Sequence, residues 1–473
     1  MQRSPWLVLV VMCVGYFLVL LDVTIVNVAL PKIGSGLHAN VSALQWVVDG
    51  YALALASLML AGGTVGDLSG HKRIVLSGLI VFGLGSVGCG LAPGAGVLVG
   101  ARIAQGVGAA MLLPGTLAII SHAFPDGPEQ AKAIGVWAGI GSLALPAGPL
   151  LGGALIAAFG WRSVFLINVP IVLVALVVAI VVVKESTDRR GRRLDLAGVA
   201  LGVAFLTAVT FAFIEGGHLG AGSPTVLGAA VAAIVLLATF LAVERRQGER
   251  AMLPVALFQR TEFSVANAAA WAMNLGTLGS LFVLTLFLQS TQGRSPLTAG
   301  LAMIPLFAPL AVISPLAGRL NSRIGPRLPI AVGFVLTAVG LALLTASTGG
   351  TGYLLLLPAF LLWGVGLGIV TPAVVAAAIA AVPADRAGLA SAINNTARQA
   401  GGAIGIALAG SIAGQPTSGS SFVSGFHAVA IGAAALYLVT AVAGAVLIPG
   451  RTSERSRPSS QRGGQKAPGL ARH

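Results

Sequence analysis

The sequence predicts an all-α membrane protein with fourteen transmembrane helices. Hydrophobic residues make up 56% of the 473 residues, charged residues only 9%, and the mean hydropathy is +0.94. Soluble domains carry about 25% charged residues, so lipid must contact most of this surface. Apolar runs long enough to cross a bilayer recur at residues 6–30, 44–66, 74–92, 96–120, 131–158, 162–183, 194–214, 224–243, 263–290, 298–320, 328–347, 353–378, 387–413 and 425–449.

The first apolar run needs a separate test, because Arg3 followed by apolar residues is also typical of a signal peptide. The run is too long for that, it contains Asp22 and Asn27, and it shows no clear cleavage site. We therefore interpret residues 6–30 as the first membrane helix. Cys13 and Cys89 also lie inside apolar runs, where we expect small buried side chains without a disulfide or metal role.

The formal net charge of +14 does not indicate nucleic-acid binding, because the basic residues lie in short loops and in the tail rather than on one face. With fourteen helices, 23 of the 28 Lys and Arg fall in the termini and the even-numbered loops. The positive-inside rule then places both termini in the cytoplasm of a multi-pass protein of the cell (inner or cytoplasmic) membrane. Among these residues are Arg189, Arg190, Arg192 and Arg193.

An internal repeat divides the chain into two halves. Gly106, Gly108 and Pro114 recur 258 residues later as Gly364, Gly366 and Pro372, and Gly63, Asp67, Gly70 and Lys72 recur 255 residues later as Gly318, Ser322, Gly325 and Arg327. Duplicated halves are common in transporters. We expect a six-helix bundle at 1–183, a two-helix insert at 184–262, a second six-helix bundle at 263–449, and a disordered basic cytoplasmic tail at 450–473.

Six segments carry a resemblance to a known family. The sequence resembles the major facilitator superfamily, in its fourteen-helix drug:proton antiporter branch, and the resemblance covers nearly the whole chain. Its motifs lie at residues 22–31, 63–73, 102–108, 148–153, 292–300 and 394–399. Leu68 and His71 stand where the loop motif at 63–73 is usually basic, and Ser322 replaces the acid of the second copy.

The resemblance implies a major facilitator fold and a function. The protein would be a monomeric, proton-coupled secondary transporter in the lipid bilayer, and it would export small apolar or cationic compounds such as drugs, antiseptics or antibiotics by alternating access. The proton would be the coupling ion, with no other cofactor. The resemblance does not separate these substrates from a metabolite of the host cell.

Four ionisable residues fall inside the predicted helices: Asp22, Asp49, Arg102 and Arg398. Such residues are costly in lipid and are functional candidates. Helix rise places the first three in the outer half of the membrane. We hypothesise that Asp22 or Asp49 binds the transported proton and that Arg102 tunes it, since burial favours a neutral carboxyl and a nearby Arg favours a charged one. The alternative is a static ion pair.

Arg398 has no acidic residue in the helices of its own half. It can bind backbone carbonyls, water or an anionic substrate group, and the residues alone favour a structural role.

Two glycine-containing segments are candidates for moving parts. In the loop, Gly63, Asp67, Gly70, Lys72 and Arg73 form a possible cytoplasmic gate in which Asp67 pairs with Arg73 or caps a helix of the other half. In the fifth helix, Gly148, Pro149, Gly152 and Gly153 leave a surface without side chains, which allows close helix packing and a pivot.

The substrate pocket is weakly specified. Aromatic rings suit apolar or cationic ligands, and the candidates are Tyr16, Asn27, Trp137, Trp271, Asn274, Trp363 and Arg398.

Other functional classes fit less well. An uptake symporter of the same fold is the nearest alternative. A membrane-embedded enzyme lacks support because no metal-ligand spacing or nucleophile–base pair is evident, and the absence of a phosphate-binding loop argues against an ATP-driven pump. A channel is disfavoured by the duplicated halves.

Overall fold

The computed structural model describes residues 5–125, 127–187, 194–248, 251, 253–383, 386–416 and 419–449. These residues form helices α1 (Pro5–Leu37), α2 (Val41–Ser69), α3 (His71–Gly90), α4 (Ala95–Ala123), α5 (Gly127–Phe159), α6 (Ser163–Leu166), α7 (Asn168–Val182), α8 (Leu196–Leu219), α9 (Pro224–Gln247), η2 (Val255–Gln259), α10 (Thr261–Leu286), η3 (Phe287–Thr291), α11 (Pro296–Ala302), α12 (Ile304–Ile324), α13 (Arg327–Leu343), η4 (Leu344–Ala346), α14 (Tyr353–Ala380), α15 (Ala387–Ala413) and α16 (Ser420–Leu447). The predicted tail at 450–473 and the basic residues Arg189, Arg190, Arg192 and Arg193 lie outside the described residues.

Fewer helices of the described chain are long and apolar enough to span a membrane than the fourteen that the sequence analysis predicts. Twelve helices of the described chain are long and apolar enough to span a membrane, or thirteen if the two arms of α5 count as one span. Those arms meet at a bend of 41°, just before Pro146, whose ring disfavours a straight helix. Helix α15 has 27 residues but is not among the twelve, because Asn394, Asn395 and Arg398 lower its hydropathy.

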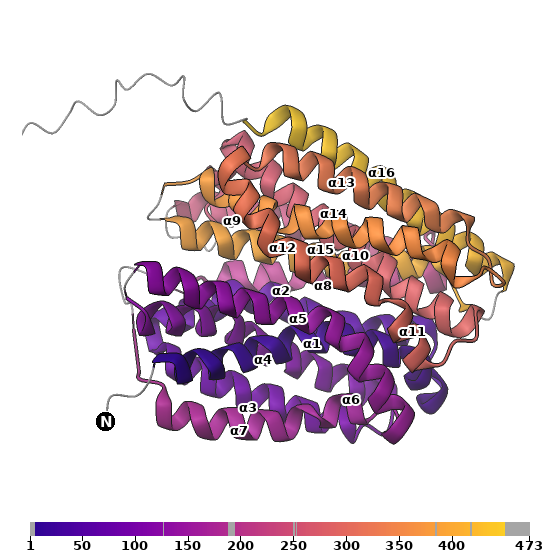
Figure 1. Ribbon diagram of the computed structural model, residues 1–473, viewed down its shortest axis with the longest axis horizontal. Helices are drawn as coiled ribbons and strands as arrows, with labels where there is room; N and C mark the ends of the chain where they lie inside the picture. The colour runs from indigo at the N-terminus through magenta and orange to yellow at the C-terminus, as the bar shows by residue number, and fades with distance from the viewer. Residues whose placement is uncertain are drawn as a thin grey trace, which may run out of the picture.

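The helices form two groups that lie side by side (Figure 1). Helices α1 to α7 make up one group and α10 to α16 the other, while α8 packs against α2 of the first group and α15 of the second. The start of α1 and the end of α16 lie at the same end of the molecule. Helix α8 therefore contacts both groups directly.

The internal repeat of the sequence corresponds to a repeated packing arrangement. Helix α4 passes between α2 and α3, with Gly106 close to the α2 backbone and Gly108 close to α3. In the second group, α14 passes between α12 and α13, with Gly364 close to the α12 backbone and Gly366 close to α13. The repeated glycines occupy the same places because a side chain there would collide with the neighbouring helix.

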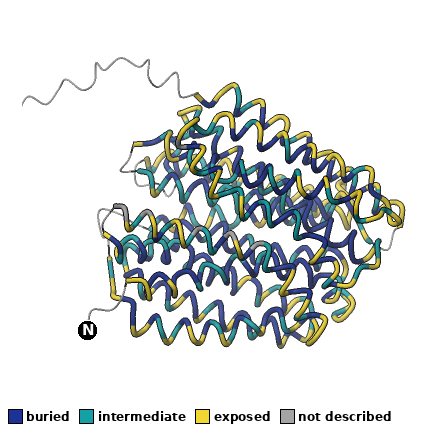
Figure 2. The backbone as a smooth tube through the Cα atoms, in the orientation of Figure 1, coloured by how far each residue is buried: buried dark blue, intermediate teal, exposed yellow. Residues whose placement is uncertain are grey.

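Burial follows the pattern of a protein surrounded by lipid. Exposed residues lie mainly on the outward sides of the outer helices, and buried residues line the inside of each group (Figure 2). The outer face of α7 exposes Leu173, Val174 and Val177 by 56–65%. Large apolar faces of this kind are rare on soluble monomers and are suited to acyl chains.

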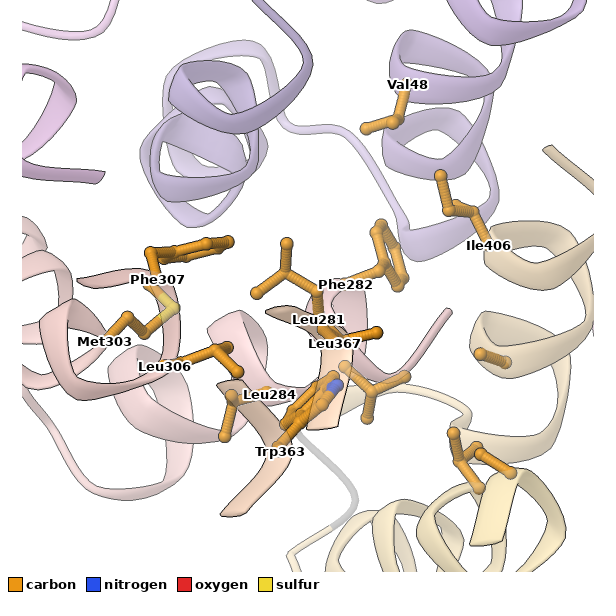
Figure 3. Close-up of a cluster of buried hydrophobic side chains, with 14 of the residues drawn as sticks. Val48, Leu281, Phe282, Leu284, Met303, Leu306, Phe307, Trp363, Leu367 and Ile406 are labelled. Atoms are coloured by element: carbon orange, nitrogen blue, oxygen red, sulfur yellow. The ribbon is translucent and has the colours of Figure 1, made fainter. Parts of the chain in front are cut away.

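The largest buried apolar cluster joins the two groups. In Figure 3, Val48 of α2 and Ile406 of α15 approach each other above Phe282 of α10. A hydrogen bond lies at the same contact, since the Gln45 side-chain amide of α2 donates to the Ala407 carbonyl at 2.8 Å. The two groups are therefore packed directly on one another here.

Candidate functional site

Asp22 and Arg102 form a buried ion pair between α1 and α4. The Arg102 Nη1 atom donates to Asp22 Oδ2, and both side chains are at most 1% exposed. Arg102 also donates through Nε to the Val47 carbonyl at 2.9 Å, and its guanidinium lies 4.4 Å from the centre of the Tyr51 ring. The α1, α2 and α4 helices thus meet around one charged pair. The sequence analysis left open whether Asp22 or Asp49 lies beside Arg102, and the structure places Asp22 there.

A network of neutral polar side chains extends this pair. Gln105 accepts from Arg102 Nη1 at 3.0 Å and donates to Ser86 at 2.8 Å, and the Cys89 thiol donates to Gln105 at 3.1 Å. Asn168 of α7 lies 3.4 Å from the Ser86 hydroxyl. Sequence reasoning did not assign a role to these four residues. The available signal was the spacing of Gln105, which lies three residues after Arg102 on the same helix face.

Asp49 is buried at a different place from the Arg102 network. It is fully buried in α2, and neither carboxyl oxygen has a hydrogen-bond partner among the described residues. One turn away on each side, Gln45 contacts α15 and Leu53 packs in a cluster with Leu206 of α8. Asp49 therefore lies on the face of α2 that meets α8 and α15, whereas Arg102 contacts Asp22.

The loop between α2 and α3 is held by charged contacts. Asp67 lies 3.3 Å from His71 Nε2, so the imidazole that replaces a basic motif residue still faces the acid. Arg73 lies 3.6 Å from Glu185, and the backbone N–H of Lys72 donates to Glu185 at 3.0 Å. Glu185 is thus the partner that the structure gives to Arg73, and it was not a candidate in the sequence analysis.

Of the two gate glycines, Gly70 occupies a site where a side chain is disfavoured, and Gly63 makes an ordinary packing contact. Gly70 has φ +112°, and a Cβ atom there would collide with the Glu185 carboxylate. Gly63 packs against Pro114 of α4, with its virtual Cβ 3.4 Å from the ring. Gly318 faces Pro372 in the second group in the same way. The repeated Gly–Pro contact brings the end of α2 close to α4 in the first group, and the end of α12 close to α14 in the second.

The glycine segment of α5 packs between the two groups. Gly148 and Gly152 lie against Ile25 of α1. A Cβ atom on Gly148 would lie 2.9 Å from the Ile25 backbone nitrogen, and a Cβ atom on Gly152 would lie 2.9 Å from the Ile25 side chain. On the other side, a Cβ at Gly153 would lie 2.6 Å from Leu297 Cα, at the start of α11. Pro149 contacts α11 as well, since its carbonyl approaches Gly300. This segment therefore seals a contact between α1 and the second group.

Three of the predicted pocket residues come together. The Tyr16 and Trp137 rings are stacked, with centroids 3.8 Å apart and planes at 14°. The Arg398 guanidinium is close enough to the Tyr16 hydroxyl for an electrostatic interaction. All three residues are partly exposed. They belong to α1, α5 and α15, so both groups of helices contribute.

The other pocket candidates lie elsewhere. Trp363 is fully buried among the apolar residues of the second group, as Figure 3 shows, so its predicted place in a pocket is not supported. Trp271 packs in the α2–α8–α15 cluster. Asn274 faces Gly402 of α15. Asn27 is buried, and its amide donates to the Val23 carbonyl of its own helix at 3.0 Å.

Comparison with known proteins identifies the family. The chain matches the Major Facilitator Superfamily model over residues 12–406 and again over 263–471. A solved bacterial homologue of the human drug peptide transporters superposes with a TM-score of 0.64 at 14% identity, covering 96% of this chain and 99% of that one. At that identity the likeness concerns the fold alone.

Curated relatives share more of the sequence. The multidrug resistance protein Stp of Mycobacterium tuberculosis is 39% identical over 87% of this chain and 76% of its own length. The puromycin resistance protein pur8 of Streptomyces alboniger is 36% identical over 96% and 93%, and the tetracenomycin C resistance and export protein of Streptomyces glaucescens is 33% identical over 87% and 76%. The chain therefore belongs to the major facilitator superfamily and is a multi-pass membrane transporter of small molecules.

Proposed function

We propose that this protein is a proton-coupled exporter of small apolar or cationic compounds that works by alternating access in the cell membrane. The observation that carries the proposal is the buried Asp22–Arg102 ion pair, which lies between two helices of one group and has no access to solvent. The relatives named for multidrug resistance, and the one named for resistance and export, support the outward direction of transport.

Protonation of Asp22 changes the forces between α1 and α4. A proton on the carboxyl cancels its charge and weakens the pair with Arg102, whose remaining hydrogen bonds go to Val47 and Gln105. The two protonation states therefore favour different contacts between these helices. A ligand that favours one arrangement shifts the population between two states, and here the proton is that ligand.

Asp49 is the second candidate for carrying the proton. An ionised carboxylate without hydrogen bonds is costly inside a protein, and uptake of a proton removes that charge. Its place against α15 couples it to the contact between the two groups. We infer that Asp22 is the principal site because its partner, Arg102, can respond to the change of charge.

The architecture suits alternating access. We infer that α5 and α15 also cross the membrane, which makes fourteen spans and puts both termini in the cytoplasm. Residues 1–183 and 263–449 would then form the two moving bundles, with 184–262 inserted between them. The α5 contact with α11 would close one side, and the loop at 63–73 would regulate the other.

The test uses inverted membrane vesicles that contain the full-length protein and whose lumen is acidified by the respiratory chain. We expect ethidium to accumulate in these vesicles and a protonophore to abolish the accumulation. Asp22→Asn should abolish it as well, with the protein still present in the membrane, while Asp22→Glu keeps a titratable carboxyl and should retain part of it. Unchanged accumulation in Asp22→Asn would remove this residue from the mechanism.

The same vesicles separate the alternatives. An uptake symporter would release preloaded substrate from acidified inverted vesicles instead of accumulating it. Asp49→Asn tests the second carboxyl in parallel, and loss of coupling in this variant alone would transfer the proton site to Asp49. A susceptibility screen in a strain without other pumps, with and without a protonophore, would distinguish exported drugs from a metabolite of the host.

A further inference from the structure

The Arg398 side chain has no counter-ion among the residues that the structure describes. It makes no hydrogen bond and no ion pair with any described residue, and its Nε atom is buried without a partner. Of the charged and titratable groups in the described chain, only the Tyr16 hydroxyl interacts with it electrostatically. A neutral hydroxyl does not compensate a guanidinium charge, so the described part of the chain leaves the positive charge at this position unbalanced.

Neither carboxylate of the first group pairs with Arg398 among the described residues. Asp22 is paired with Arg102, and Asp49, on the face of α2 that meets α8 and α15, makes no ion pair within the described chain. Sequence reasoning left three partners open for Arg398: a backbone carbonyl, water or an anionic substrate group. The described residues offer it no carbonyl hydrogen bond. Water can reach the partly exposed side chain but does not balance its charge. A cation held inside a membrane helix bundle is costly unless something pairs with it, so an anion from outside the chain is a suitable partner.

Beside Arg398 lies an aromatic surface. The Tyr16 and Trp137 rings stack at 3.8 Å, and Gly141 leaves room for Tyr16, since a Cβ at that glycine would collide with the ring. The indole Nε1 of Trp137 has no hydrogen-bond partner among the described residues. The stack thus provides ring faces in electrostatic range of a guanidinium that has no partner among the described residues.

We propose that Arg398 and the Tyr16–Trp137 stack form a binding site for aromatic compounds that carry an oxyanion, such as a carboxylate or a phenolate. The guanidinium fork binds both oxygens of the anion, and the ligand ring packs on the stack. The inference rests on the proposed function and extends its substrates beyond apolar and cationic compounds. Residues from both groups of helices would hold one ligand.

The test compares three probes with the same ring and different charges: naphthoate, naphthamide and naphthylmethylammonium. Equilibrium binding to the purified full-length protein is measured for each by calorimetry. We expect naphthoate to bind roughly tenfold more tightly than naphthamide, the size of effect expected for a charge-assisted hydrogen-bonded pair. In Arg398→Gln this preference should disappear, and Arg398→Lys should retain part of it because the charge remains without the planar fork.

Arg162→Gln is the matched control, since Arg162 is engaged with Trp161 and the Ala92 carbonyl away from the stack. Its naphthoate preference should equal that of the unmodified protein. If Arg398→Gln does not fold, the unmodified protein and Arg398→Lys still decide the question. Equal binding of the three probes to the unmodified protein overturns the proposal, as does a preference that survives in Arg398→Gln. Ethidium transport without any naphthoate preference would refute this inference alone, and absence of all transport would refute the proposed function.

Discussion

Removing one charged side chain of the Asp22–Arg102 pair should destabilise the protein strongly, because it leaves the other charge buried without a counter-ion. Asp22→Asn leaves Arg102 buried with hydrogen bonds to Val47 and Gln105 but without a counter-ion. Arg102→Met leaves the Asp22 carboxylate with only the Gln105 amide, 3.4 Å away. In both variants an uncompensated charge remains in a site that is at most 1% exposed, where water cannot screen it.

Breaking a buried pair in this way costs about 3–5 kcal/mol. We expect Asp22→Asn near the lower value, because an amide oxygen still accepts a hydrogen bond from Arg102, and Arg102→Met near the upper value. The double variant removes both charges, so its loss should be smaller than the sum of the two single losses, with a coupling energy of about 2–3 kcal/mol.

Denaturant titration of the purified full-length variants in one detergent provides the four free energies of the cycle. The Arg73–Glu185 pair is a matched control, because its side chains are 78% and 36% exposed and should show little coupling. Additive losses below about 1 kcal/mol each at Asp22 and Arg102 would show that the charges are compensated in some other way and would refute the reasoning.

Two further predictions concern glycines. Gly153→Val should reduce ethidium accumulation in inverted vesicles and lower the free energy of unfolding by about 1–3 kcal/mol, because the new side chain overpacks against the backbone of α11. Gly139→Val, with open space around it, should change neither quantity. Equal effects of the two variants would remove the packing explanation. Gly70→Ala should lower the unfolding midpoint more than Gly220→Ala, because both have positive φ but only Gly70 faces a carboxylate where the Cβ would lie. Equal unfolding midpoints of the two variants would mean that backbone strain alone, and not the contact with Glu185, lowers the stability.

The functional centre was only partly predictable. Asp22 and Arg102 stand out in the sequence because charged residues are rare in apolar helices. Gln105, Ser86 and Asn168 are neutral, and neutral polar residues are common in such helices, so their shared network became evident only from hydrogen bonds across α3, α4 and α7.

Trp363 and Arg73 illustrate the same limit. Trp363 was grouped with a pocket by its chemistry, yet its helix turns it into the apolar core. Arg73 was one of two partners considered for Asp67, the other being a helix end of the other half, and the structure places Arg73 beside Glu185, which is distant in the sequence and close in the fold. Residue type alone does not specify which way a helix faces.

Composition and hydropathy by themselves determined that the chain is helical and embedded in lipid, and the repeated glycines determined that it has two related halves. The first property depends on the free energy of moving each side chain from water to lipid, and the second depends on the spacing of residues along the chain. The tertiary structure alone decided that Arg102 pairs with Asp22 and not with Asp49, and that Arg398 joins Tyr16 and Trp137. Most faces of these helices are apolar, so hydropathy cannot specify how each helix is rotated, and contacts between distant residues depend on that rotation.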